Sequence, residues 1–308
     1  MTLPIRVLGG TSVEVSALGY GAMELRGADY RGPAISDEDA GRLLNELLDS
    51  GVSLIDTSID YGHSEELIGR YLGSRRDEFF LASKCGCQLY LPPGVPPTSV
   101  AHDYGAANIR AGVEQSLIRL RTDRLDLVQV HVSPSPSVME AAGTIEELAS
   151  LRAEGKVRFI GMSGTLPNLP DHIEMGVFDV FQIPYSALQP ECDELISRAA
   201  KGGAGVLIRG GAARGTASAD KNWTVQPLTS SGPAAQDRWQ AAGLDEVLEK
   251  GMSRHEFILR FTLSHPGLSS TIVGSSNAAH VRSNVAIASR GPLPDDVYAE
   301  ARRRLGLA

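Results

Sequence analysis

Four side chains of types used in acid–base chemistry lie at the ends of predicted strands. They occur in SLIDTSIDYGHSEE, FFLASKC and DLVQVHVSP, and they are Asp56, Tyr61, Lys84 and His131. Each segment predicts a short apolar strand that runs directly into a loop. The carboxyl ends of parallel strands meet at one edge of a sheet, so these side chains are predicted to share one site. Together they indicate a site that gives a proton to a carbonyl oxygen.

Tyr61 is the predicted proton donor of this site. The reference pKa of tyrosine, about 10, suits protonation of an alkoxide but is too high for fast exchange near neutral pH. Lys84 is therefore expected to lower the pKa of Tyr61 by stabilising the phenolate. Asp56 is expected to keep Lys84 charged and in place. His131 is expected to hydrogen-bond the carbonyl oxygen and to orient it.

Each of the four residues also has a purely structural alternative. Asp56 could bind its own turn, and Tyr61 could pack on the rim of the fold. Lys84 could hold its ammonium in solvent, and His131 could be a hydrogen-bonded core histidine. Any one of these alternatives is common for a residue considered alone. Four such residues at the exits of three successive strands favour the shared site.

Composition excludes several classes of protein. The chain has 308 residues, of which 42% are hydrophobic and 21% are charged, as is typical of a soluble globular protein. Its net charge of -8 argues against nonspecific nucleic-acid binding and against binding to an anionic membrane surface. We expect no membrane span, because no apolar run is long enough, and no signal peptide, because MTLPIRVLGG lacks an apolar core.

The cysteines predict a reducing environment and no metal. Cys85, Cys87 and Cys192 are too few for a disulfide framework, so a cytoplasmic location is expected. Cys85 and Cys87 form a C-x-C pair, but no second Cys or His pair follows at the spacing of a zinc site. The sequence therefore predicts no metal site.

Apolar runs alternate with helical patterns along the chain, which predicts parallel strands joined by helices. The predicted strands are 17–21, 52–56, 79–83, 125–130, 157–162, 179–183, 204–208 and 270–273. The predicted helices are 36–50, 64–72, 106–121, 144–154, 190–201, 253–265, 278–287 and 295–304. The helix between the fifth and sixth strands has the weakest pattern.

Eight such strands predict an α/β fold, a closed (β/α)8 TIM barrel forming a single domain over residues 1–308. A doubly wound open sheet is the alternative, but no G-x-G-x-x-G motif follows any strand. Residues 5–8 and 13–15 predict a β-hairpin that precedes the barrel. Two insertions, 88–104 and 210–240, follow strand ends and predict extended loops at the C-terminal face, where barrel enzymes bind substrates.

The segments LIDTSIDYGHSEELIGRYL, FFLASKCG, DRLDLVQVHVSP and GKVRFIGMSG together resemble aldo-keto reductases. The resemblance extends from RVLGGTSVEVSALGYG to TIVGSSNAAHVRSNV and so covers nearly the whole chain. It implies a (β/α)8 barrel that binds an extended nicotinamide cofactor, usually NADP(H), without a Rossmann domain. It also implies a catalytic tetrad of Asp56, Tyr61, Lys84 and His131, with Tyr61 as the acid.

The resemblance also implies residues around the nicotinamide. Ser163 and Gln182 match positions that hold the carboxamide, although the family usually has Asn after that serine and this chain has Gly164. Arg209 stands where many members stack a tyrosine on the nicotinamide. Its planar guanidinium could cover the ring face, or it could contact a cofactor phosphate or a substrate carboxylate.

The adenosine end of the cofactor is expected to lie at the helix after the eighth strand, because a helix N-terminus suits a phosphate. The residues that the resemblance places there are Gly274, Ser275, Ser276, Asn277, His280 and Asn284. Many NADP-specific relatives have Lys and Arg in place of Gly274 and His280. The helix terminus and the hydroxyl groups favour NADP(H), while the missing cations leave NAD(H) as the alternative.

The predicted reaction is NAD(P)H-dependent reduction of an aldehyde or a ketone to an alcohol, reversible in principle, with the proton from Tyr61. The expected partner is a small carbonyl substrate, with neither nucleic acid nor membrane. A Schiff-base aldolase is one alternative, although a salt-bridged Lys84 is a poor nucleophile. A cofactor-sensing regulatory subunit with little turnover is another, since Gly164 and Arg209 depart from the family pattern. The sequence predicts neither the identity of the substrate nor the oligomeric state.

Overall fold

Eight parallel strands close into a barrel in the computed structural model, which describes residues 2–25, 35–89, 101–213 and 235–307. Around the barrel the strands are β10 (Ser270–Val273), β3 (Leu18–Gly21), β4 (Leu54–Asp56), β5 (Phe80–Cys85), β6 (Leu125–Val130), β7 (Val157–Ser163), β8 (Val180–Pro184) and β9 (Gly205–Arg209). Strand β10 pairs with both β9 and β3, and this pairing closes the barrel. The predicted (β/α)8 fold is therefore confirmed.

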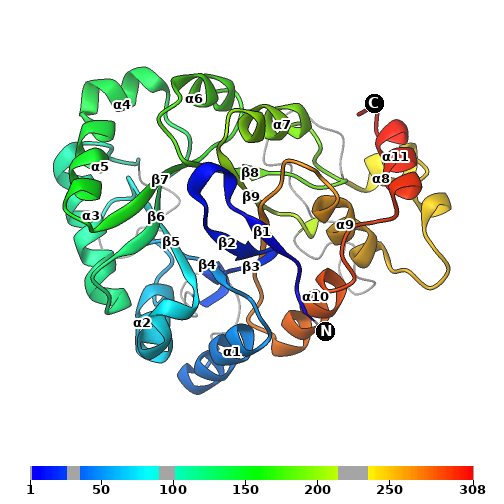
Figure 1. Ribbon diagram of the computed structural model, residues 1–308, viewed down its shortest axis with the longest axis horizontal. Coiled ribbons are helices and arrows are strands. Elements are labelled where there is room, and N and C mark those ends of the chain that lie inside the picture. The colour runs from blue at the N-terminus through cyan, green and yellow to red at the C-terminus, as the bar shows by residue number, and fades with distance from the viewer. Residues whose placement is uncertain (1, 26–34, 90–100, 214–234, 308) are drawn as a thin grey trace.

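Helices surround the barrel, and all but the last two of them lie between successive barrel strands (Figure 1). They are α1 (Asp37–Asp49), α2 (Ser64–Leu72), α3 (Ala106–Leu120), α4 (Pro136–Ala142), α5 (Thr144–Ala153), α6 (Leu169–Met175), α7 (Asp193–Lys201), α8 (Ala235–Ala241), α9 (Arg254–Leu263), α10 (Ala278–Ala288) and α11 (Asp295–Arg304). Helix α6 is the weakly patterned helix between the fifth and sixth strands. Helices α4 and α8 were not predicted, and α8 lies at the end of the expected insertion 210–240.

Helix α1 shows how local sequence sets these boundaries. Ser36 caps the helix by accepting a hydrogen bond from the Asp39 amide, and three acidic residues occupy the first turn. The face toward the barrel is formed by buried leucines, namely Leu43, Leu44, Leu47 and Leu48. Gly51 follows with a φ of +86°, a conformation in which glycine is favoured after a helix. The helix predicted over 36–50 is confirmed.

An apolar layer fills the inside of the barrel. Its residues alternate along the strands, and they include Leu54, Phe80, Ala82, Leu127, Val180, Leu207 and Ile272. Side chains two residues apart on a strand point to the same face, so the next inward position along each strand lies one layer closer to the C-terminal end. Those next positions are occupied by polar residues on five strands, namely Asp56, Lys84, Gln129, Gln182 and Arg209, and by Gly274 just after β10. The fold therefore places a polar layer directly above the apolar one.

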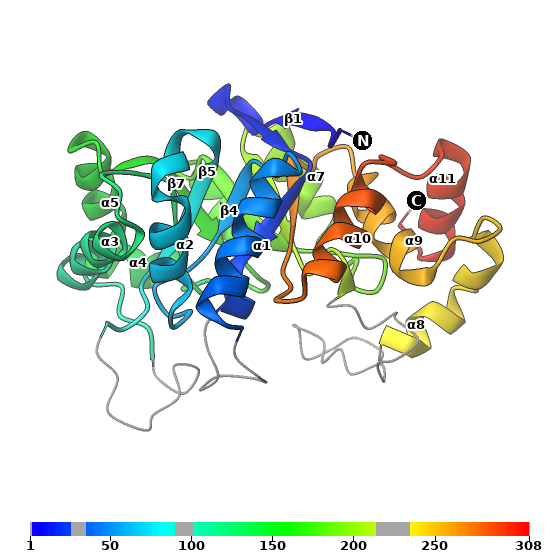
Figure 2. The same cartoon turned by 90° about the horizontal axis from the view of Figure 1, so that it is seen from below.

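A hairpin closes the opposite end of the barrel. Strands β1 (Ile5–Val7) and β2 (Glu14–Ser16) pair antiparallel, as predicted, and they lie above the barrel in Figure 2. Leu8 and Val15 reach into the apolar layer, and the Gly10 amide donates to the Gly203 carbonyl at 2.7 Å. Because β9 begins at Gly205, the hairpin covers the N-terminal ends of the strands. The hairpin does not cover the C-terminal ends of the barrel strands, where the polar layer lies.

Two differences from the predicted boundaries bear on the site. The third strand was predicted over 79–83, but β5 runs from Phe80 to Cys85, so Lys84 lies within the strand. Most of the two predicted insertions, residues 90–100 and 214–234, falls outside the described residues. Among the residues that the structure describes, no helix is both long and apolar enough to cross a membrane.

The contact between the hairpin and β9 can be tested with a Gly9→Ala variant. Gly9 has a φ of +54°, and a Cβ there would approach the Gly205 nitrogen to 2.2 Å. We expect a loss of about 3 kcal/mol in the free energy of unfolding, from backbone strain and the collision together. Gly155, with a φ of +77° and no atom near its Cβ position, is the matched control. Gly155→Ala should cost about 1 kcal/mol in denaturant titrations, and equal losses for the two variants would contradict the proposed close contact.

Candidate active site

A buried ion pair forms the centre of the polar layer. Lys84 Nζ donates to Asp56 Oδ2 at 2.7 Å and to the Thr57 carbonyl at 2.7 Å. Both charged side chains are almost fully buried, with 2% of each residue exposed. Asp56 ends β4, and Lys84 is the fifth residue of the neighbouring strand β5. Two charges can be buried this deeply only if each satisfies the other.

The second oxygen of Asp56 is bound as well. Asp56 Oδ1 accepts hydrogen bonds from Gln129 Nε2 at 2.9 Å and from Gln182 Nε2 at 2.8 Å. Sequence analysis did not single out Gln129. It is a polar residue in an apolar strand, two residues before His131, and this spacing was a usable signal. Asp56 on β4 thus accepts hydrogen bonds from side chains on three other strands, β5, β6 and β8.

Lys84 carries a positive charge in this environment. Burial alone would lower the pKa of Lys84, but its interactions with Asp56 and Tyr61 outweigh burial and raise the pKa above its usual value. A permanently protonated ammonium has no lone pair with which to attack a carbonyl. This geometry therefore does not favour the Schiff-base alternative.

Tyr61 lies against the ion pair. It follows β4 in a turn in which its amide donates to the Ser58 carbonyl, and the Lys84 Nζ lies 4.8 Å from the centroid of its ring. Burial raises the pKa of Tyr61, and the opposing effect of the Lys84 charge is smaller. Lys84 lowers the pKa of Tyr61, as expected, but desolvation of the phenolate outweighs this effect and leaves the pKa above its usual value. Tyr61 is held as a neutral acid.

His131 follows β6 immediately. Its amide donates to the Cys85 carbonyl at 3.0 Å, and its own carbonyl accepts from the Tyr104 hydroxyl at 2.8 Å. Burial lowers the pKa of His131 to about 3, and the Lys84 charge acts in the same direction. The imidazole is therefore neutral near pH 7, with one N–H group to donate. Its Nδ1 lies 3.2 Å from the Cys87 Sγ.

The residues predicted for the nicotinamide lie at the same end of the barrel. Ser163 ends β7, Arg209 ends β9, and Gln182 lies on β8 between them. Ser163 Oγ donates to Gln182 Oε1 over a long 3.5 Å, while the amide of Gln182 is held by Asp56. At Gly164, a Cβ would approach Leu169 Cδ1 to 2.7 Å, so Leu169 fills the space of the family's asparagine side chain.

The segment predicted for the adenosine end connects β10 to α10. A Cβ at Gly274 would lie 2.4 Å from the Gly21 carbonyl oxygen, so the close backbone approach favours glycine. Ser275 Oγ accepts from the Asn277 amide at 3.1 Å, and Asn277 Oδ1 caps the helix through the Ala279 amide at 2.9 Å. Ser276 and His280 are exposed at this helix terminus.

One predicted cofactor residue lies farther along α10. Asn284 is buried, and its Oδ1 lies 2.7 Å from His255 Nε2 on α9. Arg282, two residues before Asn284, forms an ion pair with Glu46 of α1 through contacts of 2.9 and 3.1 Å. The structure thus brings the tetrad together and places the other predicted residues around the same end of the barrel. Their individual roles stay predictions.

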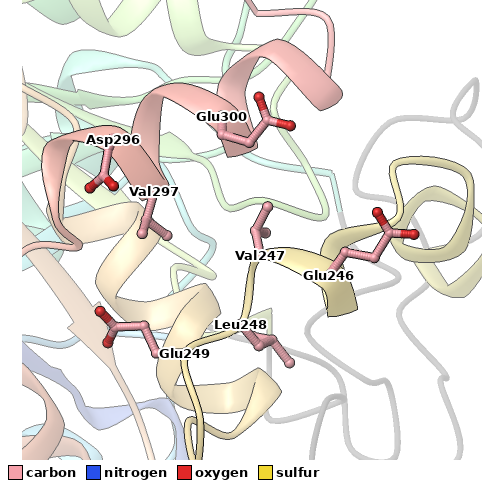
Figure 3. Close-up of a pocket in the computed structure, with 7 residues that line it drawn as sticks. All are labelled: Glu246, Val247, Leu248, Glu249, Asp296, Val297 and Glu300. Atoms are coloured by element: carbon pink, nitrogen blue, oxygen red, sulfur yellow. The ribbon is translucent and has the colours of Figure 1, made fainter.

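A separate hollow of about 300 Å³ lies away from this polar layer. It is formed by η6 (Leu244–Val247), the residues after it and α11, and Figure 3 shows its lining side chains. The lining contains the carboxylates of Glu246, Glu249, Asp296 and Glu300, and Arg304 pairs with Glu246 and Glu300. No member of the tetrad lines it, so we do not assign the carbonyl chemistry to this hollow.

Comparisons with known proteins agree with the geometry. A model of the "Aldo/keto reductase family" matches residues 17–304. The chain belongs to the aldo/keto reductase family. As a member of this family it is an oxidoreductase, and it has the closed eight-stranded barrel described above.

Individual relatives match this aldo/keto reductase over most of its length. L-galactose dehydrogenase of Arabidopsis thaliana is 29% identical over 299 residues, covering 92% of this chain and 88% of the relative. D-threo-aldose 1-dehydrogenase of a Pseudomonas species is 27% identical, covering 93% of each chain. Among solved structures, the holo form of an aldo-keto reductase from Bacillus halodurans has 26% identity and a TM-score of 0.82, covering 99% of this chain and 97% of its own.

The buried ion pair can be tested by replacing Lys84 with methionine, which keeps its length and removes its charge. Asp56 would then be a buried anion with only amide donors, and we expect the free energy of unfolding to fall by about 3–5 kcal/mol. Lys156→Met is the control, because Lys156 pairs with Glu114 and Glu154 at the surface. That control should cost no more than about 1 kcal/mol in the same denaturant titration. Equal losses in the free energy of unfolding for the two variants would mean that burial of Asp56 does not require the charge of Lys84.

Proposed function

We propose that this aldo/keto reductase catalyses the NAD(P)H-dependent reduction of an aldehyde or a ketone to an alcohol, in a reversible reaction. The observation that carries the proposal is the Tyr61 ring lying 4.8 Å from a buried, charged Lys84 that Asp56 holds in place. This arrangement supplies a neutral acid beside a permanent cation. Such a pair suits a reaction in which negative charge develops on an oxygen.

The residues divide the chemistry among them. When bound, the nicotinamide supplies the hydride to the carbonyl carbon. Tyr61 gives its proton to the carbonyl oxygen, and Lys84 stabilises the phenolate that remains until solvent reprotonates it. His131, held neutral by burial, donates a hydrogen bond that orients the carbonyl oxygen. Asp56 acts through Lys84 and does not touch the substrate.

The described residues fit an extended nicotinamide cofactor. Ser163 and Gln182 share only a 3.5 Å hydrogen bond, which a carboxamide can replace without disturbing the 2.8 Å bond from Gln182 to Asp56. Arg209, at the end of β9, would contribute to the nicotinamide end. The exposed start of α10 offers backbone amides, Ser276 and His280 to a phosphate.

NADP(H) stays our proposed cofactor, with NAD(H) as the alternative. The helix terminus with its hydroxyl groups favours a 2′-phosphate. The ion pair between Arg282 and Glu46 favours NAD(H). It engages the guanidinium of α10 that could bind a 2′-phosphate, and it places a carboxylate that would repel this phosphate beside the helix. The affinities of the protein for NADPH and NADH show which of these two effects is larger.

We propose aldoses as the first substrates to examine, both as hydride acceptors with NAD(P)H and as hydride donors with NAD(P)+, since the relatives concerned are named as dehydrogenases. Support comes from two relatives named for sugar substrates, L-galactose dehydrogenase and D-threo-aldose 1-dehydrogenase, each of which matches more than nine-tenths of this chain. The regulatory alternative rests on Gly164, whose neighbouring space Leu169 fills, and on Arg209 in place of the family's stacking tyrosine. Tight nicotinamide binding without turnover across a panel of aldoses, aldehydes and ketones would support that alternative.

A Tyr61→Phe variant tests the proposed acid. Without the phenolic hydroxyl we expect turnover with NADPH and an active aldehyde to fall by about 10²–10⁴-fold, since general acid catalysis is lost. Cofactor affinity, followed by nicotinamide fluorescence, should stay within about twofold, because the ring is kept. Tyr71→Phe on α2 is the matched control and should keep wild-type turnover. Wild-type turnover in Tyr61→Phe would overturn the assignment of Tyr61.

A Glu46→Gln variant tests where the 2′-phosphate binds. Removing the carboxylate frees the exposed Arg282, so we expect NADPH to bind about 3–10-fold more tightly, while NADH affinity stays the same. Glu38→Gln is the control, because Glu38 is an exposed residue of the same helix that pairs with Arg42 at 3.8 Å. Unchanged NADPH affinity in Glu46→Gln would place the phosphate away from Arg282. Fluorescence titrations with both nucleotides give the comparison.

A further inference from the structure

Three metal-ligating side chains meet beside the tetrad. They are Cys87 from the residues after β5, His102 from the residues before α3, and His131 from the end of β6. One potential ligand atom from each lies within 4.8 Å of the other two. Cys87 is buried, whereas the two histidines are partly exposed.

The distances within this cluster resemble those around a tetrahedral metal. The Cys87 Sγ lies 3.2 Å from His131 Nδ1 and 3.6 Å from His102 Nε2. With zinc bonds of about 2.3 Å to sulfur and about 2.0 Å to nitrogen, tetrahedral ligands are separated by about 3.6 Å. Both sulfur–nitrogen distances are thus close to the required value. The two imidazole rings, whose centroids are 5.4 Å apart with an interplanar angle of 75°, have to turn so that a nitrogen of each faces the ion.

The segments that carry the cluster are fixed by hydrogen bonds of their own. The Asp103 amide donates to the Gly86 carbonyl at 2.9 Å, which joins the neighbours of His102 and Cys87. Asn108 Nδ2 donates to the Cys87 carbonyl at 3.2 Å. The Tyr104 hydroxyl holds the His131 carbonyl at 2.8 Å. The three ligands are therefore brought together before any ion binds, which lowers the cost of forming a site.

The donor set selects the class of ion. One sulfur and two imidazole nitrogens suit Zn²⁺ or Co²⁺, and they are poor ligands for Mg²⁺ or Ca²⁺, which require oxygen donors. Asp60 lies close enough for its charge to act on all three side chains. Its buried Oδ1 has no hydrogen-bond partner among the described residues. This anion offsets the repulsion that Lys84 exerts on an entering cation.

We propose that Cys87, His102 and His131 form a binding site for one Zn²⁺-class divalent cation at the edge of the carbonyl site. Binding forms one bond to the Cys87 sulfur and one to each histidine, and the thiol proton leaves to solvent. A fourth coordination position is left for water. No metal was predicted from the sequence because the ligands lie 15 and 44 residues from Cys87, on separate segments that only the fold brings together.

The site would also fix the chemistry of His131. A cation on Nδ1, the nitrogen nearest Cys87, leaves the ring hydrogen on Nε2. Nε2 is then the nitrogen that can donate to a carbonyl oxygen. The metal would thus select one tautomer of the residue that orients the substrate.

The test is titration of the purified full-length protein, treated with chelator, with Co²⁺ and then Zn²⁺. We expect one Co²⁺ per chain, with the sulfur-to-cobalt charge-transfer band and the intense visible bands of a tetrahedral site, displaced stoichiometrically by Zn²⁺. Cys87→Ser should abolish the charge-transfer band, and His102→Gln should weaken Zn²⁺ binding by about tenfold or more. Cys85→Ala, two residues away, is the matched control and should bind like the wild type.

Absence of the charge-transfer band in the wild type, or its survival in Cys87→Ser, would overturn the proposal. Thermal unfolding of each variant shows whether it is folded. Nicotinamide fluorescence of the same samples separates this proposal from the proposed reaction. A protein that binds and turns over NAD(P)H but takes no cobalt refutes only the metal site, and one that takes cobalt but never binds a nucleotide refutes only the reductase.

Discussion

The ion pair between Asp56 and Lys84 is the interaction on which the rest of this site depends. Neither charge could stay buried without the other, because the desolvation of a lone ion costs several kcal/mol. Asp56 also accepts from Gln129 and Gln182, so strands β4, β5, β6 and β8 meet at one carboxylate. The barrel supplies this convergence because each of these residues lies two positions beyond the apolar layer on its own strand.

The same burial has opposite results for two neighbouring bases. It lowers the pKa of His131 to about 3, yet Lys84 stays protonated because Asp56 compensates for its desolvation. The site therefore contains one permanent cation and one neutral hydrogen-bond donor within a single pocket. Burial raises the pKa of Tyr61 and the Lys84 charge lowers it, and because burial has the larger effect Tyr61 stays protonated. These protonation states depend on the burial and the partners of each group more than on the type of residue.

Strand ends and periodicity were enough to predict the barrel and to group Asp56, Tyr61, Lys84 and His131, since parallel strands bring their carboxyl ends together. The direction of the Tyr61 pKa shift was not predictable, because it depends on how deeply the ring is buried. The contacts of Gln182 with Asp56 and of Cys87 with two histidines join distant parts of the chain. Helix α6 was weakly patterned because it is a single short segment of seven residues containing a proline.

The order in which the barrel can be completed during synthesis follows from its closure. The first barrel strand pairs with the last, through Leu18 and Thr271, and the hairpin before it contacts Gly203. A ribosome must therefore release most of the chain before the first 20 or so residues can find their final neighbours. Until then the inner apolar layer has no complete enclosure. A nascent chain of this topology depends on late, long-range closure of the barrel. Before closure it exposes hydrophobic surface that chaperones can bind.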